Sequence, residues 1–269
     1  MTILFSHESS VSLGHVYPFL HDLSSTLKCN VICYDYSGYG FSRGTPSEEE
    51  VKNDIEEVGL FAIQELNIPS DELILMGHSL GMAPTLHLAN NKKFANVAGL
   101  VLLSPISSGM SKRKDVFNNK DIIGRILSPI FLIHGKKDGI IPIKHSIELS
   151  RHIQNLYKWF PKKEGHNIIT ECRMKFFKKF KFFIDYLSRL PKPSDNKIYP
   201  LALCSNEQYN MHTSRGMQRE ENYMINNTSD SVKLDSRDIN DYNYKDMSFC
   251  TLKEDDDNSN INVTNTKLP

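Results

Sequence analysis

Residues 72–90 read ELILMGHSLGMAPTLHLAN, and this stretch decides the fold. Its first five residues form an apolar run typical of a buried strand, and residues 82–90 have the composition of a helix. A turn that joins them so tightly brings backbone segments close together, which requires small residues at Gly77 and Gly81. We therefore expect Ser79 to adopt a strained conformation, with its hydroxyl exposed at the amino end of a helix.

Outward from this turn, the chain up to about residue 190 alternates apolar runs with helical patterns, which indicates a parallel sheet covered by helices. We expect strands at Thr2–Ser6, Asn30–Asp35, Glu72–Met76, Ala98–Leu103, Pro129–His134 and Tyr157–Phe160. We expect helices at about 15–27, 47–66, 80–90, 143–154 and 170–189.

The last of these helices carries an aromatic stripe among lysines. Packing on the sheet is the favoured interpretation of this stripe, and contact with an anionic membrane surface is the alternative. The stripe consists of Phe176, Phe180, Phe183 and Leu187.

Residues 191–269 differ in composition from the rest of the 269-residue chain. They are rich in Asn, Asp, Ser and Lys and hold few aliphatic residues. Such a stretch buries too little apolar surface to offset the entropy lost on ordering it. We therefore predict one domain, residues 1–190, followed by a disordered polar tail, residues 191–269.

Composition excludes several classes of function. The formal net charge is zero, so nothing attracts nucleic acid electrostatically. The five cysteines are scattered and include no Cys-x-x-Cys pair, which indicates neither a zinc site nor a disulfide framework. The start of the chain does not fit a signal peptide, and no segment reaches the ~18 apolar residues that span a bilayer. We expect a cytoplasmic protein, with peripheral contact with membranes as the alternative.

A serine hydroxyl becomes a good nucleophile only when a base removes its proton. Asp138 follows the expected strand 129–134, and His166 occupies the loop between the last strand and the last helix. A turn-forming aspartate and a surface histidine are the alternatives for each residue alone, but the order Ser, Asp, His at successive strand ends favours a catalytic triad. Asp138 would then fix the tautomer of His166 and stabilise its protonated form. We expect no cofactor or metal, because such a triad activates its own nucleophile.

The developing oxyanion also needs hydrogen-bond donors. The backbone N–H of Leu80 is one candidate by the geometry of the turn, and the N–H of Ser9, after the first strand, is the other. Glu8 stands between His7 and Ser9, where glycine would be the comfortable residue. Unless Glu8 points away, its carboxylate should slow the reaction.

Several motifs together resemble the α/β-hydrolase-domain-containing protein 17 family over about residues 2–188. These motifs are Leu4–His7, Tyr34–Gly40, Gly77–Gly81 with Pro84 and Thr85, Ser104–Gly109, His134–Gly135 with Asp138, and Gly165–Asn167. The resemblance implies the α/β-hydrolase fold, a mostly parallel sheet with helices on both faces. It also implies palmitoyl-protein thioesterase activity, because members remove acyl groups from protein cysteines, and Ser79, Asp138 and His166 fall on the family's triad.

The chain departs from this family in three ways. The family has glycine where this chain has Glu8. Thr2–Ser6 corresponds to the family's third strand, so the first two strands are expected to be missing. The family's lipidated, cysteine-rich amino-terminal segment has no counterpart before Met1, so we do not expect a membrane anchor of that kind.

Three hypotheses about function follow. The first is a serine hydrolase that removes palmitoyl groups from acylated proteins through an acyl-enzyme on Ser79. The second is a carboxylesterase or lipid esterase that uses the same triad on an acyl ester. The third is a catalytically weak binding protein with a hydrolase fold, which Glu8 and the missing strands favour.

Overall fold

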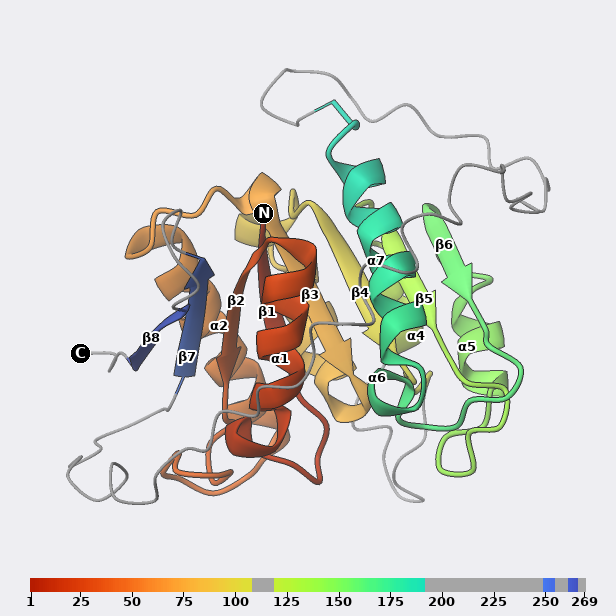
Figure 1. Ribbon diagram of the computed structural model, residues 1–269, viewed down its shortest axis with the longest axis horizontal. Helices are drawn as coiled ribbons and strands as arrows, with labels where there is room; N and C mark the ends of the chain where they lie inside the picture. The colour runs from red at the N-terminus through yellow and green to blue at the C-terminus, as the bar shows by residue number, and fades with distance from the viewer. Residues whose placement is uncertain (108–118, 192–248, 255–260, 266–269) are drawn as a thin grey trace, which may run out of the picture. The chain divides into compact units, whose positions relative to one another are not determined.

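The computed structural model describes residues 1–107 and 119–191, together with the strand backbone of residues 249–254 and 261–265. Six parallel strands form most of the sheet (Figure 1). They are β1 (Thr2–Ser6), β2 (Asn30–Tyr34), β3 (Leu73–His78), β4 (Gly99–Leu103), β5 (Ile130–Ile133) and β6 (Leu156–Trp159). Each lies within two residues of its prediction.

Helices connect these strands, as the alternating pattern predicted. They are α1 (Leu13–Leu27), α2 (Glu48–Gln64), α3 (Met82–Asn90), α4 (Asn119–Ile123), α5 (Lys144–Leu149), α6 (Ile168–Glu171) and α7 (Arg173–Leu187). Short 3-10 turns lie at Ser70–Glu72, Ser79–Gly81 and Lys92–Phe94.

Two of the predicted helices differ from the structure. The helix expected at 143–154 ends at Leu149, and the one expected at 170–189 is divided at Cys172. The backbone of Cys172 is non-helical, with φ −147° and ψ 44°, which accounts for the division. No helix in the described part of the chain is both long and apolar enough to cross a bilayer.

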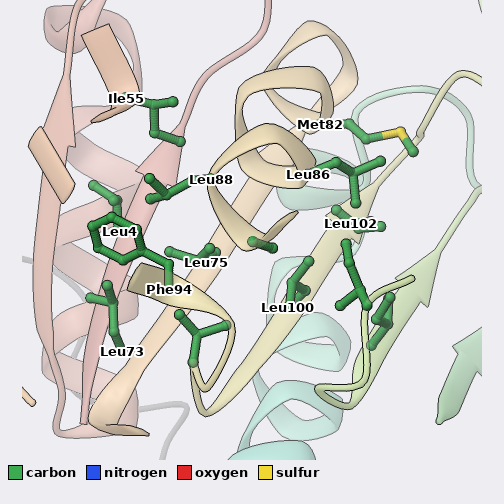
Figure 2. Close-up of a cluster of buried hydrophobic side chains, with 14 of the residues drawn as sticks. Leu4, Ile55, Leu73, Leu75, Met82, Leu86, Leu88, Phe94, Leu100 and Leu102 are labelled. Atoms are coloured by element: carbon green, nitrogen blue, oxygen red, sulfur yellow. The ribbon is translucent and has the colours of Figure 1, made fainter. Parts of the chain in front are cut away.

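The sheet separates two apolar cores, because side chains alternate between its faces. Ile3 and Phe5 of β1 pack against α1 and α7, which lie together in front of the strands in Figure 1. Leu4 points the other way, toward the core formed with Ile55 of α2 and Leu86 of α3 (Figure 2). The structure therefore confirms helices on both faces of the sheet.

The aromatic stripe of α7 packs inside the protein. Phe176, Phe180 and Phe183 are fully buried and Leu187 nearly so, and all four belong to the core that also contains Phe19 of α1. Packing on the sheet is thus confirmed as the role of the stripe. Contact of the neighbouring lysines with membranes stays a prediction.

Two strands extend the sheet beyond β2, where the sequence predicted only a polar tail. Strand β7 (Phe249–Glu254) pairs antiparallel with β2, and β8 (Ile261–Asn265) pairs antiparallel with β7. The order is β6-β5-β4-β3-β1-β2-β7-β8. The structure differs from the prediction at these two segments because short runs such as Phe249–Leu252, rich in residues that favour strands, are masked by the polar composition around them.

Pairing with β7 gives partners to backbone groups that a free edge of β2 would expose. The prediction for residues 192–248 lies outside the described residues.

Candidate active site

The turn after β3 has the strained geometry that its sequence predicts. Ser79 has φ 53°, in the left-handed region that few non-glycine residues adopt. A Cβ on Gly81 would lie 2.0 Å from the carbonyl oxygen of Ser6, and one on Gly77 would lie 2.4 Å from that of Gly81. Any side chain at either position would therefore displace backbone, and the close approach packs the turn against the end of β1.

Asp138 lies in the loop after β5, where its buried carboxylate is held on both oxygens. Oδ1 accepts hydrogen bonds from the backbone N–H groups of Ile140 at 2.9 Å and Ile141 at 2.8 Å. Oδ2 lies 2.7 Å from Nδ1 of His166. Burial raises the pKa of Asp138, but the N–H groups and His166 outweigh it and hold the pKa below its usual value. The carboxylate is therefore ionised at neutral pH.

His166 lies in the loop between β6 and α6, and its ring is almost enclosed, with 9% of the side chain exposed. The Ser104 hydroxyl donates a hydrogen bond to the His166 carbonyl at 2.9 Å, which fixes the loop over the end of β4. The ring of His78 lies beside that of His166, with centroids 5.4 Å apart. His78 directly precedes Ser79, so the turn after β3 lies close to the His166 ring, and the pairing of Ser79 with His166 stays a prediction.

His134, at the end of β5, supports this arrangement from beneath. Its Nε2 lies 3.1 Å from Oδ2 of Asp138 and 2.8 Å from the carbonyl of Ile141, and its Nδ1 lies 2.7 Å from the hydroxyl of Ser146. Burial lowers the pKa of His134, so the ring stays neutral at pH 7. His134 therefore supports the loop that carries Asp138.

The predicted oxyanion donors lie in segments that meet. Leu80 is the middle residue of the 3-10 turn Ser79–Gly81, and this turn packs on the backbone of Ser6 and His7. Ser9 follows two residues later. No described contact joins its N–H to the turn, so its role stays a prediction.

Glu8 does not point away from the site. Its Oε2 lies 3.7 Å from Nε2 of His166, and the side chain is 15% exposed. Nε2 is the ring nitrogen opposite the one held by Asp138, so it is the atom that would exchange a proton with Ser79. A carboxylate therefore lies beside the ring nitrogen that would accept the Ser79 proton.

The segment that follows β2 holds the loop after β1 in place. Asp35 accepts a hydrogen bond from the N–H of Leu13 at 2.8 Å and lies 3.2 Å from Nε2 of His7. The hydroxyl of Tyr36 donates to the carbonyl of His7 at 2.7 Å. Both side chains are buried and hold the loop that carries Glu8 and Ser9.

Comparison with known proteins identifies the family of this chain. The family model for phospholipases and carboxylesterases matches residues 34–188, more than half of the chain. The chain belongs to the phospholipase/carboxylesterase family.

Relatives within this family confirm the resemblance to protein 17. Alpha/beta hydrolase domain-containing protein aho-3 of Caenorhabditis elegans is 34% identical over 195 residues, covering 68% of this chain and 57% of that protein. Alpha/beta hydrolase domain-containing protein 17B of Homo sapiens is 35% identical over 193 residues, covering 68% of this chain and 66% of that protein. The chain thus spans less than two thirds of the length of these relatives.

Solved structures confirm the fold of this phospholipase/carboxylesterase family member. An esterase from Pyrococcus furiosus superposes with a TM-score of 0.57 at 17% identity, covering 69% of this chain and 80% of that one. Alpha/beta hydrolase domain-containing protein 10 from mouse superposes with a TM-score of 0.55 at 18% identity. The match covers 69% of this chain and 90% of that one. At these identities the likeness shows the α/β-hydrolase fold alone.

Three contacts of His166 in this family member were not predicted from the sequence. They are the contacts with Ser104, His78 and Glu8. The φ of 46° at Ser104 gives it a strained backbone like that of Ser79, and strain of this kind collects at functional sites. Nothing in the local sequence predicts that all three meet at His166, because they lie in segments that only the folded sheet brings together.

Proposed function

We propose that this chain is a serine hydrolase that cleaves acyl thioesters and esters through Ser79, His166 and Asp138, with acylated proteins as its substrates. The observation that carries the proposal is the geometry at the sheet edge. A strained serine directly follows β3, the ring of the preceding His78 lies beside that of His166, and Nδ1 of His166 lies 2.7 Å from Oδ2 of Asp138. These features support a base oriented by a carboxylate near a strained serine, as nucleophilic acyl transfer requires.

Each residue then has one task. His166 accepts the Ser79 proton at Nε2 while Ser79 Oγ attacks the acyl carbonyl, and Asp138 stabilises the imidazolium that forms. The imidazolium then donates this proton to the departing thiolate or alkoxide, which leaves an acyl group on Ser79. Water then attacks the acyl carbon while His166 takes one of its protons, and the imidazolium returns this proton to Ser79 Oγ as the bond between Oγ and the acyl carbon breaks and the acid leaves. Backbone N–H groups of Leu80 and Ser9 would hold the oxyanion in both steps.

Support for thioesters over esters comes from the relatives at 34–35% identity, which resemble the depalmitoylating family named above. The family description, phospholipase and carboxylesterase, favours the ester as a second candidate substrate. Turnover of a palmitoylated cysteine peptide, compared with that of a short-chain ester, separates the two substrates.

The first experiment is labelling of the purified chain with a fluorophosphonate probe, which reacts with activated serines. We expect labelling that disappears in Ser79→Ala. A folded chain that does not label would refute the hydrolase proposal and favour the weak binding protein instead, a role supported by the position of Glu8 beside His166.

A further inference from the structure

Three potential metal ligands meet beside Ser79. A carboxylate oxygen of Glu8 and one ring nitrogen each of His78 and His166 all lie within 4.8 Å of one another. They come from the loop after β1, the end of β3 and the loop before α6. We propose that these residues bind a zinc ion, and that the bound ion keeps His166 from accepting the Ser79 proton. The second part of this proposal rests on the function proposed above.

The ligands suit zinc in type and spacing. Two imidazoles and one carboxylate form a donor set that zinc uses when a fourth position stays open. Bonds of about 2.0–2.1 Å in tetrahedral geometry place neighbouring ligand atoms about 3.3 Å apart. Oε2 of Glu8 and Nε2 of His166 are already 3.7 Å apart. Rotation of the partly exposed Glu8 side chain would close most of the remaining gap.

The two histidines are prepared to bind a cation. The contact of Asp138 with Nδ1 of His166 leaves Nε2 directed away from Asp138, which is the carboxylate–histidine–metal arrangement common around zinc. The ring of His78 lies beside that of His166, with centroids 5.4 Å apart, and one of its nitrogens lies within 4.8 Å of the other two ligand atoms.

Charge favours a cation at this position. The carboxylates of Glu8 and Asp138 both face the ring of His166. Within the described ranges, neither carboxylate forms an ion pair with a lysine or arginine. A zinc ion would offset both negative charges, which lie in an almost enclosed site where solvent screens them weakly.

Zinc binding would switch the reaction off reversibly. The lone pair on Nε2 of His166 can bond to zinc or accept the Ser79 proton, but it cannot do both. A chelator would restore the base.

Metal binding is tested directly by titrating the full-length chain with cobalt(II) after treatment with EDTA, because cobalt bound in a zinc site absorbs visible light. We expect one ion per chain, displaced by zinc. Glu8→Gln and His166→Asn should each weaken binding by at least about tenfold. Circular dichroism melting verifies that both variants are folded.

The matched control is Glu56→Gln, since Glu56 and His87 form another carboxylate–histidine pair, at 2.6 Å, with no third ligand beside it in the described part of the chain. This variant should bind cobalt as the parent does. Three outcomes would each refute the metal site. They are an absence of saturable cobalt binding, equal binding by Glu8→Gln and the parent, and a loss of binding in Glu56→Gln.

The effect on His166 is tested by the rate of fluorophosphonate labelling with and without zinc. Zinc should slow labelling of the parent, EDTA should restore it, and the ratio of the two rates should approach one in Glu8→Gln. Cobalt binding without labelling of the metal-free parent would refute the proposed hydrolase and leave the metal site standing. Labelling that zinc does not slow would refute the inhibition.

Discussion

Oδ2 of Asp138 lies 2.7 Å from Nδ1 of His166, so one carboxylate of the β5 loop fixes the ring that faces the end of β3. Asp138→Asn would keep the shape of this contact, but an amide can stabilise the wrong tautomer and cannot offset the imidazolium charge. We expect kcat for ester hydrolysis to fall by about 10⁴. Steady-state kinetics measures the loss, and Asp71→Asn, in the turn before β3, is the control that should retain the parent rate. Equal rates in Asp138→Asn and the parent would contradict the triad.

Position 81 requires glycine because the backbone of Ser6 leaves no room there for a side chain. In Gly81→Ala the new methyl group would meet the Ser6 carbonyl at 2.0 Å, and this backbone atom cannot rotate away. We expect the free energy of unfolding to fall by about 3 kcal/mol. Gly14→Ala, in α1, is the control, because nothing lies within 4 Å of its added methyl group. The free energy of unfolding of Gly14→Ala should rise by about 0.5–1 kcal/mol, because alanine favours a helix more than glycine does. Urea denaturation measures both changes, and a neutral Gly81→Ala would disprove the tight turn.

His78 makes stability depend on pH. Burial lowers its pKa from 6.5 to about 4, so between these values the unfolded chain binds a proton at His78 that the folded chain does not. The stabilisation is complete above pH 6.5 and is lost as the pH falls toward 4. The full difference corresponds to about 3 kcal/mol. Other titratable side chains face this ring, namely His166, Asp138, His7 and Glu8, so the informative quantity is the difference in stability between variant and parent.

We expect His78→Gln to lose less stability than the parent between pH 7 and pH 4.5. Urea denaturation in EDTA at both values measures the difference. His87→Gln, at a partly exposed helix position, should behave as the parent does. Parallel losses in His78→Gln and the parent would show that His78 is not held neutral by the fold.

Local sequence patterns were sufficient to predict the parallel sheet. Each strand is a short apolar run with a clear boundary, and Ser79, Asp138 and His166 each follow a strand. Because parallel strands end at one edge, this order predicts that the three residues meet, and the 2.7 Å contact of Asp138 with His166 agrees with it.

The parts that sequence did not predict depend on distant contacts. The pairing of β7 with β2 joins Val31 to Leu252, and no local pattern specifies such a partner. The approach of Glu8 to His166 depends in the same way on how β1 and the loop before α6 meet. Cys172 shows a smaller difference, because its non-helical backbone interrupts a sequence that looks continuously helical.

Glu8 also affects the proposed reaction in the absence of metal. Its carboxylate lies 3.7 Å from Nε2 of His166 and directly precedes Ser9, the predicted oxyanion donor, so it would repel the negative charge of the transition state. In EDTA we expect Glu8→Gln to raise kcat/KM for ester hydrolysis by about tenfold. Glu164→Gln, in the loop before His166, is the control and should leave the rate unchanged. A lower rate in Glu8→Gln would show instead that this carboxylate assists the reaction.

Strand β7 is expected to protect the edge of β2 from solvent. Thr251 pairs with Ile32 and lies within β7, between β2 and β8. Thr251→Pro would remove a backbone donor and disfavour strand geometry, whereas Thr251→Val keeps the donor and favours a strand. Hydrogen exchange followed by mass spectrometry should show faster exchange in residues 30–34 of the proline variant and no change in the valine variant. Strands β3 and β4, on the far side of β1, should keep their protection in both. Equal exchange of β2 in the parent and the proline variant would mean that β7 does not pair with this edge in solution.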